Sequence, residues 1–143
     1  MILGVDTDVL VNWRMKGASK HKLATRLMRR EVQAGHRLGF TPQVMGEFIH
    51  IVTDPRRFER PMTMSAAIDI ARKHWLAPEA EHIVPTPAVV ERALELLGLL
   101  RLGRKRILDT MLAATFESAK VQRLATFNRR DYEAFTFIEV VDK

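Results

Sequence analysis

The chain has 143 residues, the size of one domain, and 47% of them are hydrophobic, so we expect a single domain over residues 1–143. The absence of cysteine excludes disulfides, thiolate metal sites and a cysteine nucleophile. No apolar run approaches the roughly 20 residues of a membrane span, and the N-terminus lacks the basic region of a secretory signal. These features predict a soluble, cytoplasmic protein without a membrane association.

The net charge of +6 is concentrated in two segments. Residues 14–37 hold eight basic residues against the single acid Glu31, and residues 101–106 hold four and no acid. Such clusters attract polyanions through phosphate contacts and counterion release. They favour nucleic acid or an acidic protein as a partner, although a solvated basic helix face explains them equally well.

Short apolar segments alternate with helical patterns, which predicts a parallel sheet covered by helices. The expected strands are residues 2–5, 38–41, 82–84, 124–126 and 137–141. The expected helices are residues 9–15, 20–34, 42–52, 65–75, 87–100 and 106–119, with a short one at residues 132–134. We therefore predict an α/β fold, a three-layer α/β/α domain with a short, mostly parallel central sheet of about five strands.

Turn residues mark several helix ends. Gly35 is expected to end the second helix, Pro42 to begin the third, and Gly103 to interrupt the chain before the last long one. Apolar residues cover most of the surface of the helix that begins at Pro87. This helix is therefore expected to be well buried.

An aspartate follows the first strand. Asp6 lies at the carboxyl edge, where open α/β sheets bind ligands. However, Asp6, Thr7 or Asp8 could each cap the next helix by accepting a hydrogen bond from a free backbone N–H. Taken alone, Asp6 is more simply explained as a cap.

Two further acids lie on the apolar faces of predicted helices. Glu47 comes three residues after Val44 and four before Ile51, and Asp109 is followed by apolar residues three, four and seven positions later. An ionised carboxylate in an apolar setting must be paired, exposed in a cleft or bound to metal. A salt bridge for Glu47, and a first-turn position that complements the helix dipole for Asp109, remain as alternatives.

Polar residues also follow the fourth strand. Asn128 lies just beyond the end of this strand, on the same edge as Asp6, and could supply an oxygen ligand or only stabilise a turn. Asp131 could act in the same site or cap the short helix that follows. The sequence does not decide between these two residues.

These acids and the amide would converge if the sheet is parallel. Oxygen ligands suit a hard divalent cation, so Asp6, Glu47, Asp109 and Asn128 predict a site for Mg²⁺, with Mn²⁺ as a substitute. The five histidines show no paired ligand spacing, which disfavours a zinc hydrolase.

Four segments occur in a characteristic order over nearly the whole chain: residues 5–10 (VDTDVL), 46–48 (GEF), 108–114 (LDTMLAA) and 124–132 (LATFNRRDY). Together they resemble the PIN-domain nucleases and, among these, the VapC toxins of bacterial and archaeal toxin–antitoxin pairs. Residues 48–56 (FIHIVTDPR) also resemble one VapC subgroup.

The resemblance implies a Mg²⁺-dependent endoribonuclease that hydrolyses RNA phosphodiester bonds with a metal-activated water. Asp6, Glu47 and Asp109 would be the metal-binding catalytic acids. Asn128 would be the fourth catalytic residue, and an amide at this position favours one well-held metal over two. The resemblance also implies a homodimer and a cognate antitoxin protein as partner.

Basic residues near these segments are candidate contacts to the phosphates of an RNA substrate. They are Arg14, Lys16, Lys20, Arg104, Lys105 and Arg129. Trp13 could stack on a base if it is exposed near Asp6, although a place in the core explains it more simply.

Two other functions fit part of the pattern. Asp6 and Asp8 have the spacing of the nucleophile and general acid of haloacid-dehalogenase-like phosphatases, but Leu10 departs from that motif and Glu47 would have no role. A PIN fold without catalysis could bind RNA or a protein, although retention of the three acids argues against it.

Overall fold

The computed structural model describes residues 1–143 and contains a five-stranded sheet in the order β3-β2-β1-β4-β5. The strands are β1 (Ile2–Val5), β2 (Arg37–Phe40), β3 (Ala80–His82), β4 (Arg123–Ala125) and β5 (Glu139–Val141). Every pair of neighbouring strands is parallel. The expected parallel sheet is therefore confirmed, and the carboxyl ends of all five strands point to the same edge.

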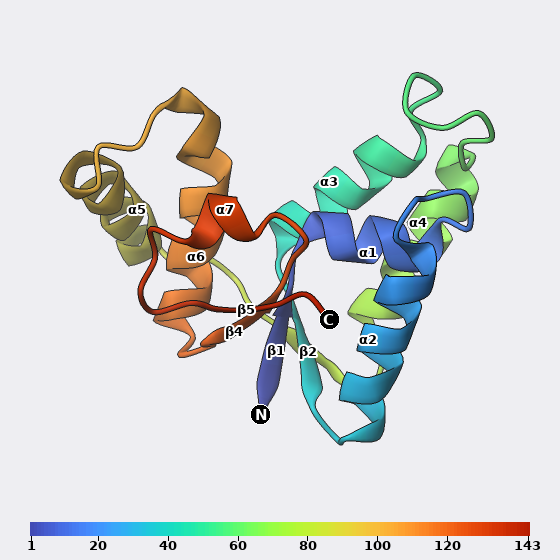
Figure 1. The fold of residues 1–143 in the computed structure, drawn as a ribbon, viewed down its shortest axis with the longest axis horizontal. Coiled ribbons are helices and arrows are strands. Elements are labelled where there is room, and N and C mark those ends of the chain that lie inside the picture. The colour runs from blue at the N-terminus through green and yellow to red at the C-terminus, as the bar shows by residue number, and fades with distance from the viewer.

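Helices cover both faces of this sheet (Figure 1). On one side lie α1 (Thr7–Arg14), α2 (His21–Gln33), α3 (Pro42–Val52) and α4 (Met64–Trp75). On the other lie α5 (Pro87–Leu99), the 3₁₀ turn η1 (Arg104–Arg106), α6 (Ile107–Ser118) and α7 (Arg129–Tyr132). The predicted three-layer α/β/α fold is thus confirmed. None of these helices has the length and apolar character needed to cross a membrane.

Local capping explains where several helices begin and end. The side chain of Asp6 accepts a hydrogen bond from the backbone N–H of Thr7, so α1 begins two residues earlier than expected. Thr41 caps α3 in the same way, and Pro42 occupies its first turn as predicted. Gly35 follows the C-cap of α2 with a φ of +83°, a conformation that favours glycine and confirms its expected role.

A close contact fixes α6 against the middle of the sheet. A Cβ atom at Gly4 in β1 would lie 2.9 Å from the ring of Phe116 in α6, so only glycine allows this approach. Phe116 belongs to one cluster of 29 buried hydrophobic residues between the layers. The packing therefore holds α6, with Asp109 in its first turn, beside the strand β1, which Asp6 directly follows.

The predicted position of the third strand is wrong by two residues. The strand comprises Ala80–His82 instead of residues 82–84, because Ala80 pairs with Leu38 in β2. β3 is an edge strand, and Arg37 of the neighbouring strand β2 donates a hydrogen bond of 2.7 Å to the side chain of Glu81 in β3. Backbone pairing sets the register here, and the apolar Val84 lies beyond the strand, 58% exposed.

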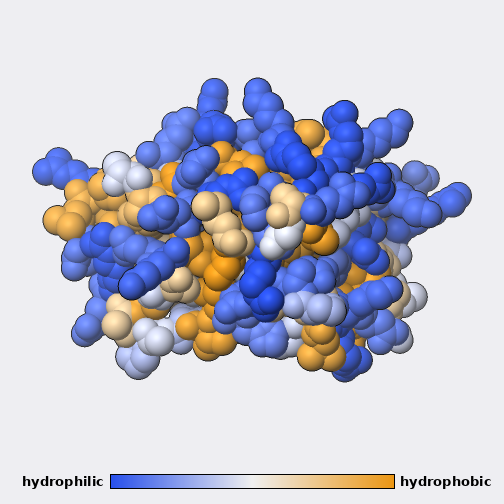
Figure 2. All heavy atoms as spheres, turned by 90° about the horizontal axis from the view of Figure 1, so that it is seen from below, coloured by the Kyte–Doolittle hydropathy of each residue, from blue (hydrophilic) through white to orange (hydrophobic).

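The prediction that the helix from Pro87 is well buried is also wrong. Val89, Ala93 and Leu96 of α5 are buried, whereas apolar side chains on its outer face are exposed, such as Leu94 (62%) and Leu99 (70%). In Figure 2, hydrophobic side chains gather at the left end of the molecule, where α5 lies. The reason is that α5 packs mainly on α6, so nothing within the chain covers its outer face.

Candidate active site

A cavity of about 510 Å³ lies at the carboxyl edge of the central strands. Asp6 reaches it from the end of β1, Glu47 from α3, Asp109 from α6 and Asn128 from the segment after β4. All four residues predicted as the catalytic set therefore line one cavity. The parallel sheet brings them together, since strand ends and the following helices meet at this edge.

Two hydrogen bonds hold the carboxylate of Asp6 in the wall of the cavity. One carboxylate oxygen accepts from the Thr7 backbone N–H and the other from the Thr126 hydroxyl, each at 2.8 Å. Burial raises the pKa of Asp6 to about 6, and the charge of Asp109 contributes to the rise. The two hydrogen bonds favour the ionised carboxylate and so oppose this rise. Asp6 is thus both the helix cap and a cavity acid, so the two explanations offered by the sequence do not exclude each other.

Asp8 is a fourth acid in the cavity that the sequence suggested only as a cap or phosphatase residue. One oxygen accepts from the Phe127 backbone N–H at 2.9 Å, and the other is buried without a partner. Burial and the charge of Asp6 raise the pKa of Asp8 to about 7. The aspartate pair two residues apart was the available signal.

Glu47 and Asp109 face the cavity from opposite helical layers. Gln43 donates to the Glu47 carboxylate at 2.9 Å and lies 3.3 Å from the Leu108 carbonyl, which links α3 to α6. Burial raises the pKa of Asp109, and the charge of Glu47 adds to this. Glu47 forms no ion pair with any lysine or arginine, which removes its salt-bridge explanation.

The structure distinguishes the positions of Asn128 and Asp131, since only Asn128 lines the cavity. Asn128 is exposed, lines the cavity and is held by a 3.1 Å hydrogen bond from its backbone N–H to Thr126. Asp131 instead pairs with Arg106 and does not line the cavity. Of the two polar residues after β4, Asn128 is the one placed to act in the site.

The candidate phosphate contacts lie in different surroundings. The Lys20 ammonium sits 4.9 Å from the ring centroid of Phe127, beside the cavity, and its charge lowers the pKa of Asp8. Arg129 pairs with Asp142 at 3.0 Å. Lys16, Arg104 and Lys105 are exposed, and Arg14 lines a separate hollow between α1 and α4.

Trp13 does not reach the acidic cavity. Its ring packs against His74 with centroids 4.7 Å apart, and it lies against the hydrophobic core. The core explanation for Trp13 is therefore correct, and its expected alternative of stacking on a base near Asp6 is not supported by its position.

Arg57 and Phe58 line the cavity from the loop between α3 and α4, and nothing in the sequence pattern indicated them. Helical and strand periodicity do not indicate where a loop lies relative to a cavity formed by segments far apart in the chain. The segment 48–56, which resembles one VapC subgroup, ends one residue before Arg57 and therefore gave no signal for either residue.

The residues of the cavity fit a divalent cation by their chemistry. The carboxylates and the Asn128 amide offer oxygen ligands, burial raises the pKa values of Asp6, Asp8 and Asp109, and one oxygen of Asp8 is buried without a partner. A cation would relieve each of these unfavourable features. The acids are nevertheless not a preassembled chelate, since no three His, Cys, Asp or Glu side chains lie close enough together to hold a metal.

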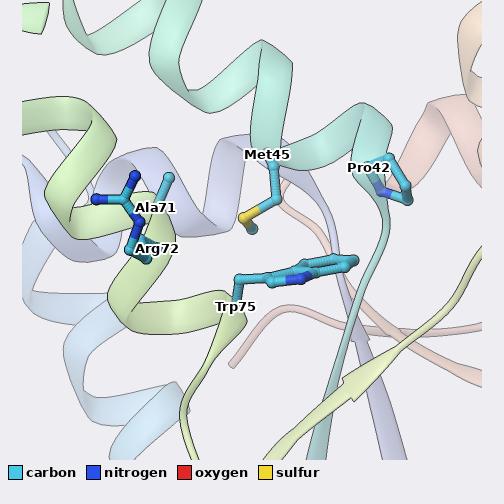
Figure 3. A pocket seen from close by; sticks show the side chains of 5 residues that line it. All are labelled: Pro42, Met45, Ala71, Arg72 and Trp75. Atoms are coloured by element: carbon cyan, nitrogen blue, oxygen red, sulfur yellow. The ribbon is translucent and has the colours of Figure 1, made fainter.

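A second cavity, of about 380 Å³, lies between α3 and α4 and has a different character. Figure 3 shows Met45 and Pro42 on α3 near the Trp75 ring, with Ala71 and Arg72 from α4 beside them. It contains no acid and none of the predicted site residues. The acidic cavity is therefore the candidate active site.

No protein-family model matches the sequence, and no curated protein matches it either. Solved structures do resemble the fold. VapC20 of Mycobacterium tuberculosis, described as a sarcin-ricin loop cleaving toxin, is 20% identical with a TM-score of 0.70, over 94% of this chain and 95% of that one.

Two toxin–antitoxin structures give the same result. A chain of VapBC-1 from nontypeable Haemophilus influenzae is 15% identical, with a TM-score of 0.69. A chain of VapBC2 from Rickettsia felis, in a structure bound to a promoter DNA fragment, is 14% identical, with a TM-score of 0.67. Each match covers 99% of this chain and 98% of the other. The chain therefore has the PIN-like fold of the VapC structures, as expected from its sequence segments.

Proposed function

We propose that the chain is a metal-dependent endoribonuclease, the toxin of a VapC-type toxin–antitoxin pair. The observation that carries this proposal is the convergence of Asp6, Glu47, Asp109 and Asn128 on one cavity at the carboxyl edge of a PIN-like fold. The description of VapC20 as a toxin that cleaves the sarcin-ricin loop supports an RNA substrate. The basic segments of this chain supply charge for phosphate contacts.

Asp6, Glu47 and Asp109 would hold Mg²⁺, or Mn²⁺ in its place. The cation would supply a lowered pKa for an attacking water and neutralise charge on the scissile phosphate. The chain itself orients the acids: Thr7 and Thr126 fix both oxygens of Asp6, and Gln43 fixes Glu47. Such supporting hydrogen bonds orient the individual carboxylates that would bind the cation.

The two alternatives are less well supported. A phosphatase that uses Asp6 and Asp8 would leave Glu47 and Asp109 without a role, although both line the same cavity. A PIN fold that only binds RNA would have no use for four acids at the place where a phosphate must approach. Neither alternative accounts for the shared cavity.

Cleavage of RNA in Mg²⁺ tests the proposal directly. Purified protein is expected to cut single-stranded or structured RNA in Mg²⁺ or Mn²⁺ and to stop in EDTA. Asp109→Asn should lower the cleavage rate at least about 100-fold, because it removes a charge from the metal site. Asp69→Asn, an exposed acid on α4, is the matched control and should cleave like the wild type. Release of phosphate from small phosphomonoesters without RNA cleavage would favour the phosphatase instead.

We further propose that the protein acts in the cytoplasm, as a homodimer in its free form, and is neutralised by a cognate antitoxin. The VapBC structures support the antitoxin, since they are complexes of that kind by name. The exposed apolar outer face of α5 supports association with a second copy, because burying it would remove Leu94 and Leu99 from water.

The antitoxin proposal predicts a particular gene arrangement. A small gene that encodes a DNA-binding protein should lie beside the gene for this chain. Co-expression of the two should yield a stable complex whose RNA cleavage is inhibited. Absence of such a neighbour would indicate a stand-alone RNA-processing nuclease.

A further inference from the structure

The acidic cavity has an unbalanced charge. Four of its residues are acids, Asp6, Asp8, Glu47 and Asp109, and Arg57 is the single lysine or arginine among its lining residues. One divalent cation would not by itself balance four carboxylates. Arg57 is therefore the one side chain lining the cavity whose permanent positive charge can attract a phosphate.

The loop between α3 and α4 is built to hold Arg57 at this place. The backbone N–H groups of Arg57 and Phe58 donate to the Asp54 carbonyl at 3.1 and 3.2 Å, and the Asp54 side chain accepts from the Arg56 N–H at 2.8 Å. Phe58 lines the cavity and packs against the hydrophobic core. These contacts fix the loop against the protein, so the position of Arg57 does not depend on a ligand.

The guanidinium group of Arg57 remains available for binding. Its nearest acid is Asp54, at 3.7 Å, and its side chain is 60% exposed, so this ion pair is weak. The side chain donates no hydrogen bond to another protein group among the 32 side-chain hydrogen bonds of the structure. The planar guanidinium group of an arginine matches the geometry of a phosphate, to which it can donate two parallel hydrogen bonds.

We propose that Arg57 is a substrate-binding residue that holds a phosphate group of the RNA at the acidic cavity. This inference rests on the proposed nuclease function and adds to it a residue from outside the four predicted ones. Arg57 supplies the positive charge by which a polyanion can enter a site lined by acids. In this role it contributes to binding of the RNA more than to the chemical step.

Arg56 provides a matched control. It is the preceding residue, pairs with the same Asp54 at 3.9 Å and is 94% exposed, but it does not line the cavity. Substituting either arginine removes one positive charge from the same loop. A difference between the two variants therefore reports the position of Arg57 and not the net charge of the protein.

The experiment compares Arg57→Ala, Arg57→Lys and Arg56→Ala with the wild type. In Mg²⁺, Arg57→Ala is expected to raise KM for RNA about tenfold with a smaller change in kcat, and Arg57→Lys to lie between it and the wild type. Binding of a fluorescein-labelled single-stranded RNA is measured by anisotropy in Ca²⁺, with the RNA checked for integrity on a gel. There, Arg57→Ala should reduce the slope of log Kd against log salt concentration by about 0.7, the loss of one phosphate contact.

The outcomes separate this inference from the proposed function. If the wild type cleaves RNA and Arg57→Ala matches Arg56→Ala in both KM and salt slope, the role of Arg57 is wrong and the nuclease proposal stands. If the wild type neither binds nor cleaves RNA, both are wrong. Equal thermal melting of the two alanine variants excludes misfolding as the cause of any difference.

Discussion

Asp6→Asn is expected to abolish RNA cleavage and at the same time to make the protein more stable. The cleavage rate should fall at least about 100-fold, because Asp6 lies at the centre of the proposed metal site. Burial raises the pKa of Asp6 to about 6, so at pH 7 its ionised form is held in an unfavourable environment. A neutral amide relieves this cost and can still accept from the Thr7 N–H. We expect a gain of about 1 kcal/mol, or about 2–4 °C in Tm.

Cleavage assays and thermal melts, each with and without Mg²⁺, test this prediction. Mg²⁺ should raise the Tm of the wild type, since a ligand that binds only the folded state stabilises it, and should not raise that of Asp6→Asn. Asp69→Asn should behave like the wild type in every measurement. An Asp6→Asn variant that cleaves RNA normally would show that the acidic cavity is not the active site.

His74→Phe is expected to make the fold more resistant to acid. His74 is buried against Trp13 and Phe40, and its Nε2 atom has no hydrogen-bond partner. Burial, with smaller contributions from the charges of Arg14 and Lys73, lowers its pKa from 6.5 to about 4. The unfolded chain therefore binds a proton below pH 6.5 that the folded protein does not. The stability that neutral His74 contributes is present above pH 6.5 and is lost as the pH falls toward 4.

Denaturant unfolding between pH 4 and pH 7.5 measures this effect. The free energy of unfolding of the wild type should fall relative to that of His74→Phe by on the order of 2–3 kcal/mol over this range. The difference between the two proteins is the relevant quantity, because the raised pKa values of Asp6 and Asp8 act on both in the opposite direction. His50→Phe, at an exposed position on α3, is the control and should keep the wild-type pH dependence. A constant difference across the range would contradict the assignment.

Much of the architecture was predictable from local patterns. Periodic apolar residues marked the long helices, and short apolar runs marked most strands. Gly35 and Pro42 act through backbone conformation and a missing N–H, so their positions could be read directly from the sequence. The candidate site was predictable for a related reason: acids on apolar helix faces are costly, so Glu47 and Asp109 stand out, and Asp6 was marked by its place at the carboxyl end of the first strand.

The errors at β3 and α5 have a common cause. The apolar run before residue 85 predicted a strand two residues too late, because the register of an edge strand follows its pairing with β2. The apolar surface of α5 predicted burial, but only the face toward α6 has a partner within the chain. In both cases the pattern described the apolar character of the segment and could not describe the neighbours that decide its pairing or burial.

The sequence by itself determined the class of fold, the helix ends set by glycine and proline, and four residues of the candidate site. Only the tertiary structure decided that Asp8 joins these acids, that Asn128 and not Asp131 lines the cavity, and that a loop brings Arg57 to it. The physical reason is the distance along the chain over which each kind of interaction acts. Periodicity and capping act within a few residues, whereas a cavity is formed by segments that lie far apart in the chain and meet only when the core packs.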